Sequence, residues 1–309
     1  MTPVTPPAAV RRRRLLAAVA PLLVLAGAMT IPALGGAGDS LDTAAAIGAS
    51  TPSSGPGSAV SVQDGGTTAD PTAAAAVLTE VEDIAAAAGG TIEVTVLDAD
   101  GKALLSSADA STPVYTASLV KLLVVHQILL QAETGTLVLT SADLQLMQAA
   151  IEASDDDAMN QLWVDFDGDA LVDSAVETFG LTGTAPPADA GQWGQTTTTA
   201  ADYATVLATY ADTLTDADGD LLTGWLQSTT STAADGFDQD FGLLSLDLDQ
   251  VAAKQGWMCC LDDTRWLHST GVLADGTVLV LLGTFPESTS WAQAGEALDA
   301  AAAATIGGT

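Results

Sequence analysis

Basic residues are scarce in this sequence. Lysine and arginine together make up 8 of the 309 residues, against 39 aspartates and glutamates, which gives a formal net charge of −31. This excess of negative charge excludes a nucleic-acid backbone, or an anionic lipid surface, as the partner of the folded part. Four of the eight bases form one run at residues 11–14, which leaves Lys102, Lys121, Lys254 and Arg265. A lysine that such a chain keeps in an apolar context therefore calls for a specific reason.

Cysteine is limited to one adjacent pair, Cys259 and Cys260. A single pair cannot build the disulfide framework of a small secreted scaffold. Neighbouring side chains of a strand point to opposite faces, so these two cysteines cannot bridge without a strained turn. We expect one of them to be buried and the other to lie near the surface, with a vicinal disulfide as the lesser alternative.

Histidine is equally rare, and neither His126 nor His268 lies beside a serine or an aspartate in a triad pattern. The G-x-S-x-G and H-E-x-x-H motifs are both absent, so a zinc site is unsupported. Two Asp-rich stretches, 165–169 and 216–220, lack the spacing and the closing Glu of an EF-hand, and solvated turns explain them better than calcium loops. The sequence predicts no metal site and no cofactor.

The N-terminus has the pattern of an export signal. No acidic residue precedes Asp39, and the arginine run is followed by a mostly apolar stretch, residues 15–34. We therefore predict that residues 1–38 are a signal peptide or a signal anchor, and that the protein is extracellular or belongs to the cell envelope. Cleavage and retention both stay open, because these 20 residues can just span a bilayer; a twin-arginine signal is a further alternative. No cysteine follows the stretch that could carry a lipid, so residues 15–34 are the only predicted membrane contact.

The rest of the chain divides into a linker and one domain. Residues 39–70 are rich in Ala, Gly, Ser, Thr and Pro without an apolar period, which is typical of a flexible linker. Residues 71–309 suit a single large domain, and 48% apolar residues in the chain are enough for a core.

Within that domain, strands are predicted near both ends and helices between them. The expected elements are a helix at 71–88, strands at 91–97 and 102–106, helices over much of 118–251, strands around 266–268 and 277–285, and a helix from 291. This order predicts an α+β fold in which distant segments form an antiparallel sheet flanked by the terminal helices, with an all-helical subdomain in addition.

A serine and a lysine open the most apolar helix of the domain. Ser118 and Lys121 are three residues apart, so on a helix they share a face. A buried lysine loses its charge more easily than an exposed one, and the neutral amine can take the hydroxyl proton of the serine. The pair is a candidate activated nucleophile. Alone, S-x-x-K is a weak signal that also fits a capping serine followed by an exposed lysine.

Two further motifs follow in order. Residues 154–156 read Ser-Asp-Asp, and residues 254–256 read Lys-Gln-Gly at the start of an apolar strand. With residues 118–121 they resemble the S-x-x-K, S-D-N and K-T-G set of class A β-lactamases and penicillin-binding proteins. The resemblance extends over about residues 71–305 and implies the β-lactamase/transpeptidase fold. Also in the places that the family pattern gives them are Ala158, Asn160 and the threonine run 196–199.

The resemblance implies a role for each matched residue. Ser118 would be the acylated nucleophile and Lys121 its general base. Ser154 would relay a proton to the leaving nitrogen, while Lys254 would add positive potential that lowers the pKa of Lys121 and attracts a substrate carboxylate. The oxyanion hole would be formed by the N–H groups of Ser118 and Trp257, whose indole either floors the groove or packs in the core.

The substrate-binding set would be Asp156, Gln255, Gly256 and Arg265. Arg265 could bind a substrate carboxylate bidentately, or it could balance the acidic turn at 262–263. Asp156 replaces the family's Asn, and a carboxylate there would pair with the general-base lysine, keep it protonated and repel a substrate carbonyl. Gln255 replaces a Thr or Ser hydroxyl, which would weaken or change carboxylate recognition.

The segment 183–195 occupies the place of the family's omega loop but contains no Glu. Class A β-lactamases use that Glu to hydrolyse the acyl-enzyme, so efficient destruction of penicillins is not expected. Asp189 is the one carboxylate of the segment and is better explained as a surface residue. Trp193 either caps the site or fills the space beside it.

The leading hypothesis is an exported serine hydrolase that acts by acyl transfer through Ser118, on a cell-wall (peptidoglycan-type) peptide or a related amide or ester, with weak or absent β-lactam turnover. A β-lactam-like small molecule is the other expected ligand. The rival is a catalytically degenerate domain on the same scaffold that binds cell wall or a partner protein. A true β-lactamase would need a deacylating base.

Overall fold

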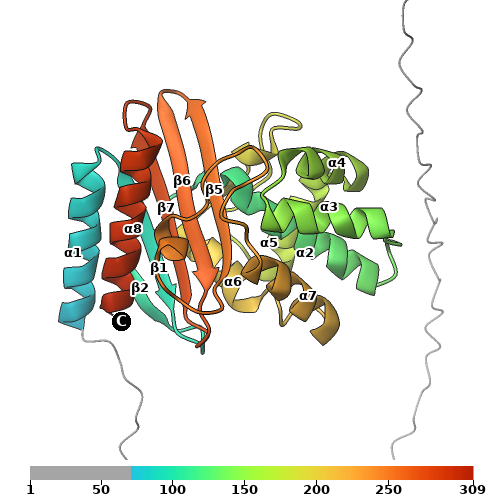
Figure 1. The fold of residues 1–309 in the computed structure, drawn as a ribbon. Helices are drawn as coiled ribbons and strands as arrows, with labels where there is room; N and C mark the ends of the chain where they lie inside the picture. The colour runs from blue at the N-terminus through green and yellow to red at the C-terminus, as the bar shows by residue number, and fades with distance from the viewer. Residues whose placement is uncertain (1–70, 309) are drawn as a thin grey trace, which may run out of the picture. The chain divides into compact units, whose positions relative to one another are not determined.

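The centre of the protein is an antiparallel sheet whose strands come from the two ends of the domain. In the computed structural model, which describes residues 71–308, the strand order is β2-β1-β7-β6-β5 (Figure 1). Its strands are β1 (Thr91–Leu97), β2 (Ala103–Ser106), β5 (Ala252–Leu261), β6 (Thr264–Val272) and β7 (Val278–Pro286). A short separate ladder pairs β3 (Val114–Tyr115) with β4 (Thr197–Thr198). The predicted signal segment and linker, 1–38 and 39–70, lie outside the described residues.

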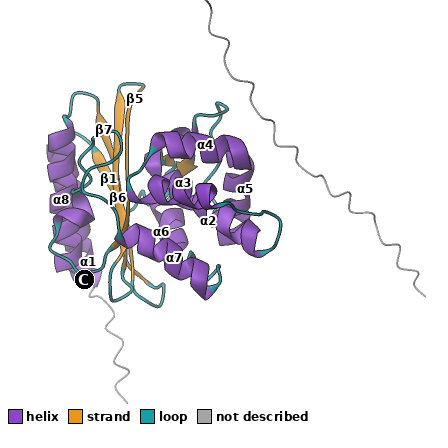
Figure 2. Cartoon of the chain, turned by 45° about the vertical axis from the view of Figure 1, so that its right-hand side comes forward, coloured by secondary structure: helices purple, strands orange, loops and turns teal. Residues whose placement is uncertain are grey.

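The two terminal helices cover one face of the sheet. Helices α1 (Pro71–Ala87) and α8 (Trp291–Gly307) pack side by side there (Figures 1 and 2). The buried positions of α1 recur every four residues at Val77, Val81 and Ala85, which aligns one apolar stripe with the sheet. No helix within residues 71–308 combines the length and the apolar character required to cross a membrane.

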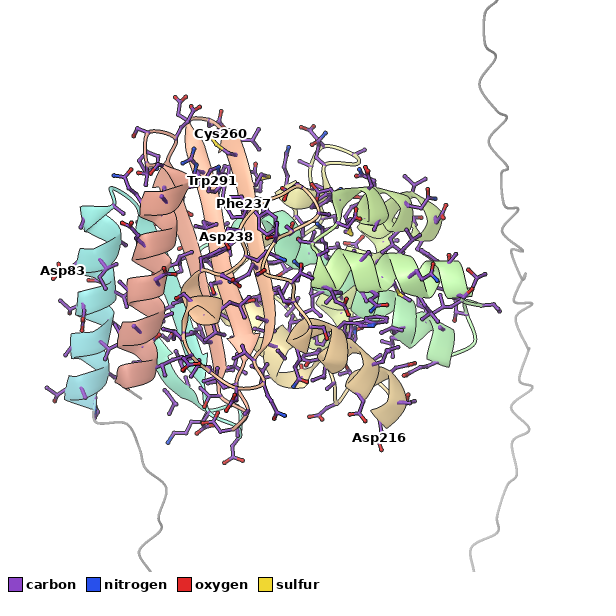
Figure 3. All side chains as sticks on the ribbon, viewed as in Figure 1. Asp83, Asp216, Phe237, Asp238, Cys260 and Trp291 are labelled. Carbon is purple, nitrogen blue, oxygen red and sulfur yellow. A yellow bond between two sulfur atoms is a disulfide. The ribbon has the colours of Figure 1, made fainter. Side chains whose placement is uncertain are left out.

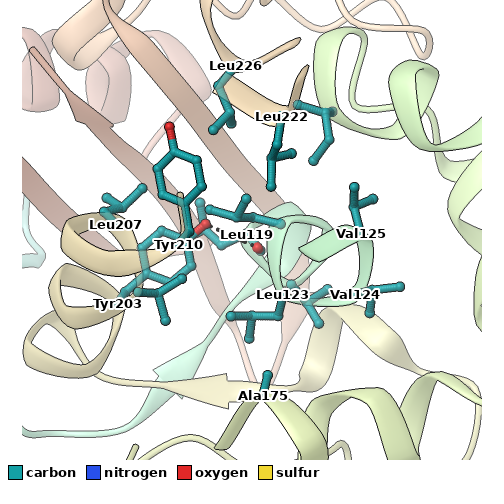
Figure 4. Close-up of a cluster of buried hydrophobic side chains, with 14 of the residues drawn as sticks. Leu119, Leu123, Val124, Val125, Ala175, Tyr203, Leu207, Tyr210, Leu222 and Leu226 are labelled. Carbon is teal, nitrogen blue, oxygen red and sulfur yellow. Dashed lines mark hydrogen bonds between the residues drawn. The ribbon is translucent and has the colours of Figure 1, made fainter. Parts of the chain in front are cut away.

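A helical subdomain packs against the other face (Figure 2). Its helices are α2 (Val120–Glu133), α3 (Ser141–Glu152), α4 (Asp156–Phe166), α5 (Gly168–Phe179), α6 (Ala200–Thr209) and α7 (Asp216–Gln227). Residues 120–129 of α2 are all buried, which fits a helix that is apolar on every side and runs through the middle of the subdomain. Its side chains meet α5, α6 and α7 in one cluster, where the Tyr203 hydroxyl donates a hydrogen bond of 3.1 Å to the carbonyl of Leu119 (Figure 4).

The predicted α+β architecture is confirmed, including the flanking terminal helices and the all-helical subdomain. The first helix ends at Ala87, where Gly89 continues the chain at a positive φ of 78° that favours glycine. The strand expected around 266–268 is longer and spans Thr264–Val272.

The expectation for the two cysteines is wrong. Cys259 and Cys260 form a vicinal disulfide near the end of β5, with Cys259 exposed and Cys260 half-buried (Figure 3). The pairing register of β5 with β6 shifts between Cys259 and Leu261, so this part of the strand departs from the regular alternation on which the expectation depended.

Gly168, the first residue of α5, offers a stability test. A Cβ added there would lie 2.0 Å from the indole of Trp163, a ring that is itself buried. We expect Gly168→Ala to lower the free energy of unfolding by about 2 kcal/mol, as overpacking of a core does. Gly224, in α7, has nothing within 4 Å of its added Cβ, so Gly224→Ala is the matched control and should be neutral or stabilising. Urea unfolding of both variants checks the contrast, and equal effects would contradict it.

Candidate active site

The predicted nucleophile lies in a tight turn between β3 and α2. Ser118 is in the 3₁₀ turn Ala117–Leu119 and is 4% exposed. Ala117 has φ 46°, a left-handed conformation that is uncommon for a residue with a side chain and that tends to mark functional sites. The backbone N–H of Thr116 donates to the carbonyl of Thr196 at 2.7 Å, which fixes the approach to the turn.

His268, on β6, holds the same turn from the sheet side. Its Nε2 lies 2.8 Å from the carbonyl oxygen of Tyr115, and because a carbonyl can only accept, Nε2 carries the proton. Burial lowers the pKa of His268 to about 4, so the ring is neutral near pH 7. His268 is thus a positioning residue that the sequence motifs did not reveal. His126 is also buried and lies 2.7 Å from the Thr213 hydroxyl.

Gly256 brings the edge strand β5 against the Ser118 turn. A Cβ at this position would meet the Thr116 carbonyl at 3.0 Å and the Leu119 side chain at 3.2 Å. Only a residue without a side chain lets the two backbones come this close. The glycine of the third motif therefore has a physical role in assembling the site.

Lys121 is completely buried at the start of α2 and points at the segment 154–156. Its Nζ donates to the Ser154 carbonyl at 2.6 Å, to the Asp156 carboxylate at 2.7 Å and to the Ser154 hydroxyl at 3.2 Å. None of these bonds reaches the Ser118 hydroxyl. Asp156, by contrast, has 58% of its side chain exposed at the N-terminus of α4.

Lys254 reaches the same serine from β5. Its Nζ lies 2.9 Å from the Ser154 hydroxyl and 3.1 Å from the carbonyl of Gln255, and its side chain is fully buried. Ser154 has φ 49°, a second strained residue at this site. The structure therefore joins all three motifs, because two buried amines from distant segments share one serine hydroxyl.

Burial dominates the electrostatics of both amines. It lowers the pKa of Lys121 below the ordinary value, while the Asp156 carboxylate acts in the opposite direction. Burial, followed by the positive charge of Lys121, lowers the pKa of Lys254 well below the ordinary value. Repulsion between two ammonium groups acts on both amines alike, so the expected influence of Lys254 on the pKa of Lys121 stays a prediction.

The segment 183–195 covers the lysine with an aromatic ring. Trp193 lies with its ring centroid 4.9 Å from Lys121 Nζ, a cation–π distance, and its Nε1 donates to the Asn160 amide oxygen at 2.9 Å. Of the two interpretations of Trp193, the structure favours a cap over the site. Asp189 is exposed and makes no ion pair with the described residues.

Two predicted binding residues point elsewhere. Gln255 is fully buried, and its amide nitrogen donates to the carbonyls of Phe241 at 2.6 Å and Gln239 at 3.2 Å. Neighbouring side chains of a strand point to opposite faces. Because Lys254 faces the helical subdomain, Gln255 lies on the opposite face of β5. Its side chain is not brought to the site, which corrects the expectation that it contacts substrate.

Arg265 is the second such residue. It is 9% exposed, donates to the Thr289 carbonyl and lies over the Trp291 ring at 4.2 Å. It forms no ion pair with the acidic turn 262–263. Arg265 therefore ties β6 to the start of α8, which corrects both interpretations made from the sequence.

Trp257 follows the third motif on β5 and packs toward α8. Its ring stacks on Phe237 with centroids 4.6 Å apart, and its Nε1 donates to Asp235 at 3.0 Å. This favours packing over a substrate-groove floor for the indole. The predicted oxyanion role of the Ser118 and Trp257 N–H groups stays a prediction.

A cavity of about 360 Å³ lies between the loop at 237–241 and α8. Phe237, Asp238 and Trp291 are among its lining residues (Figure 3). Ser118, Ser154 and the two buried lysines are not among them. Residues 71–308 contain no cluster of three or more His, Cys, Asp or Glu residues that could hold a metal ion.

Solved structures define the class of fold. A β-lactamase from Chitinophaga pinensis superimposes with a TM-score of 0.62 at 16% identity, covering 74% of this chain and 98% of that one. A β-lactamase from Xanthomonas campestris gives a TM-score of 0.61 at 20% identity, with 75% and 97% covered. An ancestral class A β-lactamase gives 0.59 at 21% identity, with 75% and 100% covered. The chain has the β-lactamase-like fold.

A sequence relative is more specific but shorter in its match. The chain is 36% identical over 203 residues to a Mycobacterium tuberculosis protein named "Putative lipoprotein LppW", and equally to a protein of that name from Mycobacterium bovis. The match covers 63% of this chain and 62% of the relative's length. No protein-family profile matches the chain.

Proposed function

We propose that this protein is an exported serine hydrolase that transfers acyl groups through Ser118. The observation that carries the proposal is the Ser154 hydroxyl shared by two buried amines, Lys254 and Lys121, of which Lys121 follows Ser118 by three residues. A serine becomes a nucleophile when a neighbouring neutral amine accepts its proton, and a hydroxyl between them can return that proton to a leaving nitrogen. The β-lactamase-like fold supports this chemistry as an analogy.

The substrate class that we propose is a peptidoglycan-type peptide or a related amide or ester. In the attack, the Ser118 oxygen bonds to the acyl carbon and its proton goes to the amine pair. The bond between the acyl carbon and the leaving nitrogen then breaks as Ser154 delivers a proton to that nitrogen. The relative's name and the arginine-led apolar stretch support a cell-envelope or extracellular location. A lipid on an N-terminal cysteine is not carried over, because both cysteines of this chain lie at 259–260.

Covalent labelling tests the proposal directly. A fluorescent penicillin and a fluorophosphonate, applied to the full chain between pH 6 and pH 10, should give an adduct that intact mass and peptide mapping place on Ser118. Ser118→Ala should reduce labelling to background, whereas Ser174→Ala, a change at a half-buried serine on α5 whose hydroxyl bonds only within its own helix, should leave it intact. Absence of any adduct on the unaltered chain over this pH range would remove the enzymatic proposal.

The acyl-enzyme is expected to be long-lived. The segment 183–195 places the ring of Trp193, and not a carboxylate, beside Lys121, and its only acid, Asp189, is exposed. With no base aligned to activate a water, the labelled fraction should decay slowly after free penicillin is removed, and nitrocefin turnover should be weak. Following the adduct by mass over hours measures its lifetime. Rapid decay that is slowed by Asp189→Asn would show instead that this carboxylate deacylates the enzyme.

A non-catalytic binding domain is the second candidate, and one observation favours it. The Lys121–Asp156 ion pair of 2.7 Å favours the protonated form of an amine that the family-like mechanism would need neutral. Binding of peptidoglycan fragments that is unchanged in Ser118→Ala, together with no adduct, would support this candidate.

A further inference from the structure

The hydrogen bonds around Ser154 determine which lysine carries the charge. An ammonium group has three N–H donors and no lone pair. Lys121 Nζ has three acceptors within 3.2 Å, namely the Ser154 carbonyl, the Ser154 hydroxyl and the Asp156 carboxylate. Two of these acceptors, the Ser154 carbonyl and the Asp156 carboxylate, can only accept, and an ammonium at this position would use its third donor on the Ser154 hydroxyl and have no lone pair for the proton of Ser118.

Lys254 lies in the opposite situation. It is fully buried and has no carboxylate in contact, since the ion pair of this cluster belongs to Lys121. Two buried ammonium groups in contact with one carboxylate would leave one positive charge uncompensated, which is unfavourable. The amine without a carboxylate partner is the one that gives up its proton.

The bonds of Ser154 are consistent with this distribution of protons. Its hydroxyl accepts from Lys121 and has one proton of its own to donate, and Lys254 Nζ lies 2.9 Å away. A neutral amine there can accept that proton and still donate to the Gln255 carbonyl at 3.1 Å.

The charged groups that face the two lysines reinforce the difference. Asp155 and Asp235, in addition to Asp156, favour the charged form of Lys121, and the face of Trp193 does the same. For Lys254 the effects of burial and of Lys121 outweigh the opposing effect of Asp156.

We propose that Lys254 is the neutral amine of the site and that Lys121 remains an ammonium. This reverses the roles that the resemblance to β-lactamases implies. The catalytic consequence rests on the proposed function. As the Ser118 oxygen attacks, its O–H bond breaks and the proton passes to the Ser154 oxygen, while the Ser154 proton passes to Lys254 Nζ. Lys254 becomes an ammonium and later returns that proton through Ser154 to the leaving nitrogen, so protons balance over the step.

The small number of lysines allows a direct test. The full chain contains Lys102, Lys121 and Lys254 only, so lysine labelled with ¹³C at Cε and ¹⁵N at Nζ gives three side-chain resonances. Lys102→Arg and Lys254→Met assign them by the loss of one resonance each. In a pH titration followed by NMR, the Lys254 resonance should show a neutral amine at a pH where Lys121 still shows an ammonium.

The outcomes separate this assignment from the proposed function. Loss of the proton from Lys121 before Lys254, or a shared titration of both, would overturn the assignment. The measurement needs no substrate, so an absent Ser118 adduct would remove the acyl-transfer proposal without changing the titration order. Asp156→Asn should move the Lys121 titration to lower pH, and an unmoved Lys121 would contradict the ion pair as its stabiliser.

Discussion

Replacing Asp156 with asparagine is expected to accelerate the acylation of Ser118 by penicillin about tenfold below neutral pH. Lowering the pKa of the base by one unit, which corresponds to about 1.4 kcal/mol, raises its neutral fraction in this range about tenfold. The Asp156 carboxylate stabilises the charged forms of both buried lysines. Its removal favours the neutral amine that accepts the serine proton, so the acidic limb of the rate profile should move to lower pH. An amide also ends the repulsion between this carboxylate and the substrate's carboxylate or carbonyl.

The neighbouring residue provides a matched control for this experiment. Asp157 is exposed on the same first turn of α4, so Asp157→Asn removes the same charge from nearly the same place without touching Lys121. The quantity to measure is the second-order labelling rate of the two variants and the unaltered chain from pH 5 to pH 9. Equal profiles for both variants would show that the Lys121–Asp156 contact has no specific influence on the reaction.

The three motifs were visible in the sequence because lysine is so scarce. In a chain with four cations outside the arginine run, Lys121 and Lys254 stood out in apolar surroundings, and the structure brings both to one hydroxyl. The order of strands and helices was equally readable, since the period of apolar residues changes from strand to helix at recognisable turns. The period of apolar residues is a local signal and the scarcity of lysine is a property of the composition, so both can be read from a single sequence.

Other features depended on geometry that one sequence does not contain. Lys254 and Gln255 are neighbours on β5, so they point to opposite faces of the sheet. Which of the two faces the site depends on how β5 pairs in the sheet, and one sequence does not show that pairing. Arg265 lies directly across from Cys259 on the neighbouring strand and reaches α8 instead of the site. The role of His268 comes from a bond to a backbone carbonyl 153 residues away, for which no sequence pattern exists.

Trp193 illustrates an intermediate case. Its segment was identified by the place it occupies between α5 and the threonine run, but the two interpretations of the ring could not be separated without the hydrogen bond to Asn160. The indole of Trp193, and not an acid, fills the space that this segment occupies beside the Lys121 amine. The segment 183–195 therefore both covers Lys121 and leaves the acyl-enzyme without a carboxylate that could activate a water.

Replacing Lys254 should make the protein more stable, because this lysine is buried in the folded state. A lysine whose pKa is lowered in the folded state holds fewer protons there than in the unfolded chain, whose lysines titrate near the ordinary value of about 10.4. Folding at lower pH must therefore strip a proton from Lys254 or bury a charge, and the free energy of unfolding rises with pH up to that ordinary value. Replacement by methionine keeps most of the volume and removes this penalty.

We accordingly expect Lys254→Met to raise the free energy of unfolding by about 2 kcal/mol at pH 7, within the range found when buried charged groups are replaced by apolar ones. This net value already includes a loss of about 1 kcal/mol, because the Ser154 hydroxyl no longer has Lys254 as a hydrogen-bond acceptor. The advantage should shrink as the pH approaches 10, while Ser118 labelling is lost at every pH. Lys102→Met makes the same substitution at an exposed position and should change stability little. Urea unfolding from pH 6 to pH 10 measures both variants, and a Lys254→Met variant that is less stable at pH 7, or equally displaced at every pH, would show that the buried amine stabilises the fold instead of opposing it.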